Sequence, residues 1–226
     1  MSAGNEWHGE YAAQIGTESF KTDETFPVLD PTTGEEIATV TESGAAGVNR
    51  ALETAKKALK EWETLDASER GRRLSDFADL MAENAERLAE VETAETGRPL
   101  SHSMAFTTER VPDYIEYFAG MADKVEGRTI PVDGTNFDFT VREPIGITAH
   151  IVPWNASLLL GIRSIAPALA AGNAVVVKPS PEAPLSILEL GKLAREADLP
   201  NGIFSVIPGY GRRTVAALTS DERVDE

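Results

Sequence analysis

The sequence contains no cysteine among its 226 residues. Disulfides, thiolate metal ligands and a thiol nucleophile are therefore excluded for these residues. Histidine is also scarce. The three histidines, His8, His102 and His150, lie far apart along the chain and show no metal-ligand spacing. We therefore predict no metal site, and we interpret His150, which lies in an apolar run, as a hydrogen-bonded core histidine.

Positive charge is in short supply. The chain has 21 lysines and arginines against 37 aspartates and glutamates, a formal net charge of −16. Nucleic acids and anionic membrane surfaces attract basic proteins, so neither is an expected partner. A strongly acidic surface maintains solubility by self-repulsion and is typical of halophilic proteins. A high-salt cytoplasm and an ordinary acidic protein both remain open.

Long hydrophobic runs are absent too. The longest, from Ile165 to Val177, is interrupted by Gly172 and Asn173 and is too short to cross a bilayer. Residues 1–16 show no basic stretch followed by an apolar one, the pattern of an export signal. We predict a cytoplasmic protein with no membrane partner.

The remaining composition is that of a globular protein, with 42% hydrophobic and 26% charged residues. Turn residues between two β-prone runs predict a hairpin over 26–40. Apolar residues at helical spacing predict helices over 44–65, 66–96 and 102–124. Asp66 and Glu69 have capping-box spacing at the start of the second helix.

The pattern changes after residue 125. Residues 126–144 look extended, and Phe137, Phe139 and Val141 alternate with polar residues. Beyond Ile145, short apolar strands alternate with helices of about a dozen residues, which is typical of a parallel sheet with helical crossovers. The fold class predicted here is α/β.

Ligands of parallel α/β sheets bind where the strands end in loops. Three strand ends carry polar or glycine-rich segments: 153–155 (Pro-Trp-Asn), 178–180 (Lys-Pro-Ser) and 208–211 (Pro-Gly-Tyr-Gly). Asn155 offers an amide donor for an oxyanion, worth about 10²–10³ in rate in a dry site. Lys178 can reach hydroxyls or a phosphate. A plain turn with a packed Trp154 and a solvated strand-end lysine are the alternatives. The turn at 208–214 has Thr214 in place of the last glycine of a dinucleotide fingerprint, so alone it is a weak signal.

The stretch HIVPWNASLLLGIRSIAPALAAGNAVVVKPS (150–180) closely resembles the cofactor domain of the NAD(P)-dependent aldehyde dehydrogenases. The segments LDPTTGEEIATV, ETGRPL, EYFAGMADKVEGRTIPV and VREPIG resemble the N-terminal half of the same family. The likeness covers nearly the whole chain after about residue 20. It implies a Rossmann-like parallel sheet with flanking helices, a cofactor that is NAD or NADP, and an aldehyde substrate.

The resemblance also implies roles by position. Asn155 would donate its amide to the oxyanion of the thiohemiacetal intermediate. The implied cofactor-binding residues are Ile151, Val152, Pro153, Trp154, Lys178, Ser180, Glu182 and Gly211. Of these, residues 151–154 would line the nicotinamide–ribose channel, Lys178 would bind the adenine ribose, and Gly211 would let the adenosine approach. Residues 126–144 resemble the arm that joins subunits into homo-oligomers.

The sequence departs from the family pattern in the cofactor region. Many NAD-preferring members place glutamate three residues after the lysine, where this chain has Pro181, with Glu182 one step later. NAD and NADP therefore both remain open. Ser164, preceded by Arg163, stands where the family often has lysine. Residues 163–182 most resemble the branch that oxidises benzaldehyde and vanillin, which indicates an aromatic aldehyde.

The family's general-base glutamate and catalytic cysteine would follow beyond Glu226. We therefore expect three parts: 1–125, a hairpin and the helical part of the cofactor domain; 126–144, the first part of an oligomerisation arm; and 145–226, the first half of the Rossmann-like domain. The catalytic domain would be absent and the chain inactive alone. Three alternatives remain: a non-catalytic interaction module that joins full-length subunits, half of a split enzyme, and a dinucleotide-binding regulator.

Overall fold

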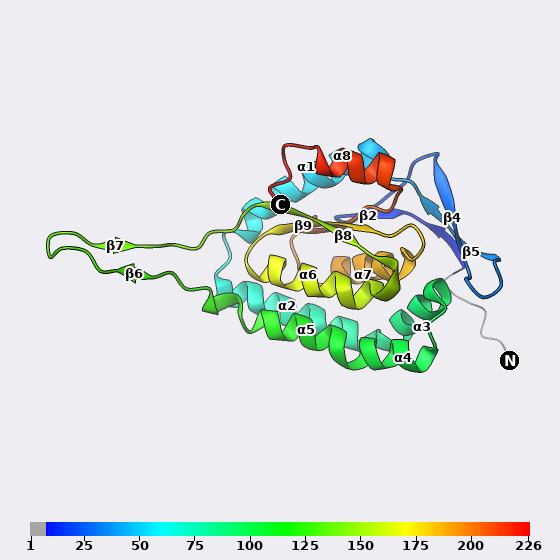
Figure 1. Ribbon diagram of the computed structural model, residues 1–226, viewed down its shortest axis with the longest axis horizontal. Helices are drawn as coiled ribbons and strands as arrows, with labels where there is room; N and C mark the ends of the chain where they lie inside the picture. Colours follow the sequence, from blue (N-terminus) through cyan, green and yellow to red (C-terminus); the bar gives the residue numbers. More distant parts are fainter. Residues whose placement is uncertain (1–7) are drawn as a thin grey trace.

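The computed structural model describes residues 8–226, with sheets and helices in stacked layers and one long hairpin that projects from them (Figure 1). The strands are β1 Gly9–Tyr11, β2 Ala13–Ile15, β3 Glu18–Phe20, β4 Thr25–Leu29, β5 Glu36–Thr41, β6 Thr129–Ile130, β7 Asp138–Phe139, β8 Ile147–Val152, β9 Ala174–Pro179 and β10 Phe204–Val206. The α-helices are α1 Gly44–Trp62, α2 Ala67–Glu83, α3 Ala85–Thr96, α4 Leu100–Ala105, α5 Val111–Ala119, α6 Ser157–Ala170, α7 Leu185–Glu196 and α8 Ala216–Thr219.

The central sheet has five strands in the order β3-β2-β10-β9-β8. Strands β8, β9 and β10 are parallel, which confirms the predicted α/β architecture. The middle strand is fully buried at Val175, Val176 and Val177, as expected of a strand covered by helices on both faces. Strands β2 and β3 add an antiparallel edge that was not predicted, because each is only three residues long.

The predicted hairpin over 26–40 is confirmed. Strands β4 and β5 pair antiparallel, and their turn contains Gly34 with a φ of +75°, a conformation that glycine adopts without strain. Strand β1 pairs parallel to β5 and completes a second sheet.

Helices cover both faces of the central sheet. Figure 1 shows α1 and α8 on one face, α6 and α7 on the other, and α2 and α5 outside α6 and α7. The apolar face predicted for α1 is buried, and Trp62 at its end donates from Nε1 to the carbonyl of Leu169 at 3.0 Å. One continuous core therefore joins the N-terminal helices to the sheet that carries the strand ends.

Two helix predictions need correction. The helix predicted over 66–96 is interrupted at Asn84, whose φ of −103° and ψ of 12° leave helical geometry while its side chain bonds the Leu80 carbonyl. The predicted capping box does not form, because Glu69 pairs with Arg72 and Arg73 instead.

The helix predicted over 102–124 consists of α4, a π turn over Phe106–Arg110, α5 and a short 3₁₀ turn over Ala122–Lys124. Pro112, at the start of α5, has no N–H to continue a regular helix. The helical spacing predicts an apolar face with Val111, Tyr114, Tyr117 and Phe118, but Tyr117 is 62% exposed, whereas Ile115 is buried.

The segment 126–144 forms the projecting hairpin of Figure 1, built on the two-residue strands β6 and β7. Every residue from 123 to 143 is exposed, including Phe137 and Phe139. Exposed apolar side chains on an extended ribbon are typical of a surface that packs against another protein chain. At the other end of the chain, Asp225 and Glu226 pair with the outer edge of β8 through backbone bonds to Ile147 and Ala149.

Candidate cofactor and oxyanion site

The carboxyl ends of β8, β9 and β10 lie at one edge of the central sheet. The register of β8 on β9 places Ile151 beside Lys178 and Val152 beside Pro179. Ile151 is exposed, whereas Val152 is buried against the core. Pro153 starts the loop after β8 with an extended backbone. The sheet therefore brings the first two predicted segments together.

Asn155 lies in a single 3₁₀ turn, Trp154–Ala156, between β8 and α6. Its side chain is exposed, and the amide makes no hydrogen bond to any described residue. Its backbone carbonyl accepts a hydrogen bond from Nη2 of Arg98. The turn thus has a fixed backbone and an amide donor that remains available to a ligand.

A hollow of about 380 Å³ lies beside this turn. Its lining includes Trp154 from the loop after β8, Glu182 from the loop after β9 and Tyr210 from the loop after β10. Lys178 and Asn155 do not line it. The Trp154 indole is 57% exposed, so the alternative of a packed indole is wrong. Of the three segments that the sequence singled out, 153–155 and 208–211 therefore reach the hollow, whereas 178–180 does not.

Lys178 is 4% exposed, so the alternative of a solvated strand-end lysine is also wrong. Burial lowers the pKa of its ammonium group, and the carboxylates of Glu182 and Glu42 oppose that shift. The neighbouring Ser180 hydroxyl donates to Glu182. A buried ammonium group has lost hydrogen bonds to water, so a hydroxyl ligand that accepts from it would offset part of that cost.

Glu42, which sequence reasoning missed, fixes the turn after β10. Its buried carboxylate accepts from the Tyr210 backbone N–H at 2.9 Å and from the Thr214 hydroxyl at 2.6 Å. Gly209 has a φ of +154°, and a Cβ there would overlap both Thr214 and Glu42. A Cβ on Gly211 would meet nothing within 4 Å, so the space beside it is open. The open backbone at Gly211 is compatible with the predicted adenosine approach.

Glu95, at the end of α3, is a second residue that sequence reasoning missed. It is 3% exposed and accepts hydrogen bonds from the backbone N–H groups of Leu185 and Ser186, at 2.5 Å and 3.0 Å, where α7 begins. Burial raises the pKa of its carboxyl to about 8 against these bonds. Glu95 therefore ties the N-terminal helices to the loop that carries Ser180 and Glu182.

The family model of the aldehyde dehydrogenases matches residues 18–226. The chain belongs to the aldehyde dehydrogenase family. Among curated relatives, mouse cytosolic aldehyde dehydrogenase 1 is 40% identical over 225 residues, which is 98% of this chain and 43% of the relative. Hydroxyisobutyraldehyde dehydrogenase of Mycolicibacterium austroafricanum is 44% identical over 200 residues, 88% of this chain and 40% of the relative. The chain thus spans less than half the length of these relatives.

Two solved structures match the fold of this chain over less than half of their own length. PnpE in complex with nicotinamide adenine dinucleotide matches with a TM-score of 0.92 and 39% identity, over 95% of this chain and 44% of PnpE. The NAD⁺ complex of the Bacillus cereus aldehyde dehydrogenase matches with a TM-score of 0.93 and 30% identity, over 96% and 45% of the two chains. The sequence-based assignment to the N-terminal part of this family is confirmed.

The residues present fit part of a nicotinamide dinucleotide of the kind that this family uses. The hollow has one aromatic wall from Trp154, and a buried cation, Lys178, lies on the adjoining strand. The next loop offers open backbone at Gly211. These groups supply contacts for a ring, a hydroxyl and an adenosine, all at the strand ends where such cofactors bind.

We expect Glu95→Gln to flatten the pH dependence of stability. The folded pKa of about 8 lies above the unfolded value of 4.5. Between these values the folded state holds a proton that the unfolded state has lost, so stability falls as pH rises, by up to about 1.4 kcal/mol per pH unit. Urea unfolding at a series of pH values measures this slope. The control is Glu196→Gln at the exposed end of α7. Equal slopes in wild type and both variants would contradict the prediction.

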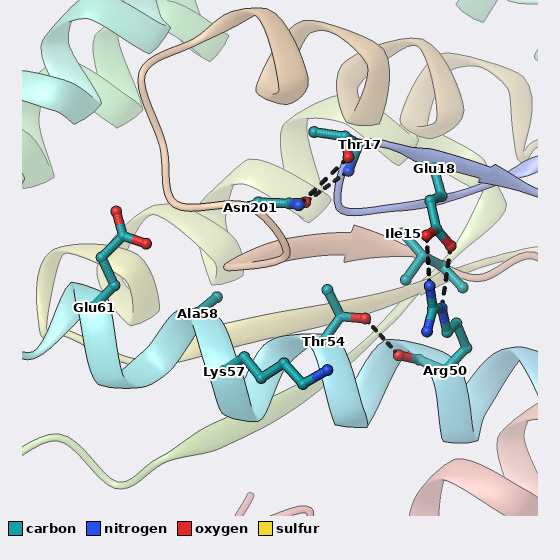
Figure 2. A pocket seen from close by; sticks show the side chains of 9 residues that line it. All are labelled: Ile15, Thr17, Glu18, Arg50, Thr54, Lys57, Ala58, Glu61 and Asn201. Carbon is teal, nitrogen blue, oxygen red and sulfur yellow. Dashed lines mark hydrogen bonds and ion pairs between the residues drawn. The ribbon is translucent and has the colours of Figure 1, made fainter.

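A second groove, of about 310 Å³, lies at the opposite edge of the central sheet from the carboxyl ends of β8, β9 and β10 (Figure 2). There Asn201 bonds Thr17, and the Arg50 guanidinium is turned to Glu18, while Lys57 lines the groove from α1. Asn201 precedes β10, so this groove lies at the amino ends of the strands. Ligands of such sheets bind at the opposite ends, and this groove is not the cofactor site.

Two further properties of residues 8–226 bear on the predictions. No cluster of three or more metal-binding side chains occurs among them, and none of their helices is long and apolar enough to cross a membrane. His150 is half-buried, with Nε2 at 2.9 Å from the Thr148 hydroxyl. Burial lowers the pKa of its imidazole to about 4, so this ring is the neutral, hydrogen-bonded core histidine that was predicted.

Proposed function

We propose that these residues form the cofactor-binding and oxyanion-binding part of an NAD(P)-dependent aldehyde dehydrogenase, which converts an aldehyde, NAD(P)⁺ and water to a carboxylic acid, NAD(P)H and a proton. The observation that carries the proposal is the loop after β8. It presents the unbonded amide of Asn155 beside the hollow lined by Trp154, one strand away from the buried Lys178.

In this mechanism Asn155 donates an N–H to the negative oxygen that develops when a thiolate adds to the aldehyde carbon. A fixed donor of this kind lowers the barrier because it needs no reorganisation during the reaction. Trp154 provides a wall for the cofactor, and Lys178 donates to a ribose hydroxyl. The cofactor, when bound, accepts the hydride. The thiolate must come from residues outside these 226, which contain no cysteine. The family resemblance places the general-base glutamate there as well.

Glu182 supports a preference for NAD over NADP. Burial lowers the pKa of the Lys178 ammonium group, and the exposed carboxylate of Glu182 lies near enough to oppose that shift. A 2′-phosphate on the ribose would meet a negative charge there, whereas a hydroxyl would find an acceptor. We further propose an aromatic aldehyde as the substrate, from the resemblance of residues 163–182. We also propose that the chain divides into three parts, 1–125, 126–144 and 145–226.

The second candidate function is a non-catalytic module, or half of a split enzyme, that assembles with longer subunits. The exposed hairpin over 126–144 favours it, because Phe137 is 75% exposed and Phe139 57% exposed. The same hairpin would join copies of the chain into the homo-oligomer expected of this family.

Lys178→Met tests the cofactor site. We expect it to weaken NAD⁺ binding by roughly tenfold to a hundredfold, the effect of removing a hydrogen bond from a charged donor. Titration of tryptophan fluorescence with NAD⁺ measures the dissociation constant, and Trp154→Phe identifies the reporter. Lys57→Met, in the groove at the opposite sheet edge, is the matched control. The site is wrong if the two lysine variants bind NAD⁺ alike, or if wild type does not bind it.

A further inference from the structure

The turn that carries Asn155 is held from outside the sheet by residues that the catalytic assignment does not use. Arg98 follows α3 and donates from Nη2 to the backbone carbonyl of Asn155. Glu92, on α3, accepts at 3.4 Å from the backbone N–H of Leu158, in the first turn of α6. The two residues therefore hold both ends of the segment 155–158.

Arg98 and Glu92 also form an ion pair with each other. Nη1 of Arg98 lies 3.6 Å from Oε2 of Glu92, and the side chains are 16% and 1% exposed. These two atoms make no hydrogen bond to any other group in the described part of the chain. Burial raises the pKa of the Glu92 carboxyl and the Arg98 guanidinium opposes that shift, so the carboxylate depends on Arg98 to hold its charge.

The Arg98 guanidinium lies over an aromatic ring. Its Cζ lies 5.0 Å from the centroid of Phe106, in the π turn that follows α4. Gly97, with a φ of +70°, ends α3 and turns the chain directly into Arg98. A guanidinium that contacts both a ring and a carboxylate has little freedom to rotate, and here its Nη2 donates to the Asn155 carbonyl.

We infer that Arg98, paired with Glu92, is a positioning residue that fixes the backbone turn from which the Asn155 side chain projects. This inference rests on the proposed function for the role of the Asn155 amide. An oxyanion donor must be held within about 0.5 Å of its working position. A displacement of about 1 Å can cost roughly a hundredfold in rate. The N-terminal helices thus contribute to the site without touching the substrate or the cofactor.

The test compares Arg98→Met with Arg110→Met in the full isotope-labelled chain. Arg110 also lies over the Phe106 ring, with Cζ 5.3 Å from its centroid, but has no bond to Asn155, so it is the matched control. Two-dimensional NMR records the side-chain amide signals of Asn155, which are assigned by their loss in Asn155→Ser. We expect Arg98→Met to change the chemical shifts of these two signals and Arg110→Met to leave the shifts at their wild-type values.

Two further variants keep the test decisive. Arg98→Lys retains a cation and should restore the wild-type shifts in part. Should Arg98→Met fail to fold with Glu92 unpaired, the double variant Glu92→Gln and Arg98→Met removes both charges and should show the same change. Unchanged Asn155 signals in a folded Arg98 variant would overturn the inference. If the signals move but wild type binds no NAD⁺, the positioning contact stands and the proposed function falls.

Discussion

Replacing Phe137 and Phe139 together by serine should convert assembled chains into monomers. The two rings lie on the projecting hairpin with centroids 5.6 Å apart, and both face solvent within one chain. A two-fold pairing of hairpins would bury four such rings. Because each buried phenylalanine contributes about 1.5–3 kcal/mol, we expect the dissociation constant to rise by at least about a hundredfold. Sedimentation over a range of chain concentrations measures it.

The control for the hairpin variant is Tyr117→Ser. Tyr117 is 62% exposed on α5, so it matches the hairpin rings in exposure but lies on a helix. Its loss should leave assembly unchanged. At chain concentrations where wild type is monomeric, both variants should unfold at the wild-type temperature, since neither site contributes to the core. Assembly that survives the double serine substitution, or that Tyr117→Ser abolishes equally, would show that the hairpin does not join the subunits.

The sequence predicted the parallel sheet and the positions of the strand ends well, because both depend on local patterns. The buried run of Val175, Val176 and Val177 and the glycine turn after β10 are legible without long-range information. The helix breaks were missed for an equally local reason. Asn84 lies at a polar position of the helical pattern and is compatible with a continuous helix. Its side-chain hydrogen bond to the Leu80 carbonyl, which accompanies the break, cannot be predicted from the apolar pattern.

The groups that support the site were missed because each acts across a long stretch of chain. Glu42 bonds residues 168 and 172 positions away, and Glu95 bonds residues 90 and 91 positions away. In the sequence each is one acid among 37, on segments where a charged residue usually faces solvent. Only the packing of the N-terminal helices on the sheet distinguishes these buried carboxylates from the solvated ones.

The purified chain should produce no NADH from benzaldehyde and NAD⁺. Asn155 can stabilise a negative oxygen, yet the oxygen gains its charge only when a nucleophile attacks the carbonyl carbon. Aldehyde oxidation of the proposed kind uses a thiolate for that attack, and none of the 226 residues is a cysteine. The oxyanion donor therefore has no intermediate to stabilise, and the expected rate equals that of the solution without protein.

Absorbance of the reduced nicotinamide measures this turnover, in high salt because the chain is strongly acidic. A full-length aldehyde dehydrogenase assayed in parallel shows that the substrate and cofactor are competent. Asn155→Ala distinguishes activity of this chain from that of a contaminant, because the rate of a contaminating enzyme would not change with the substitution. NADH production that rises with chain concentration and falls in Asn155→Ala would mean that the oxyanion donor works with a nucleophile other than a thiolate. In that case the mechanism proposed here would be wrong, although the cofactor site would remain.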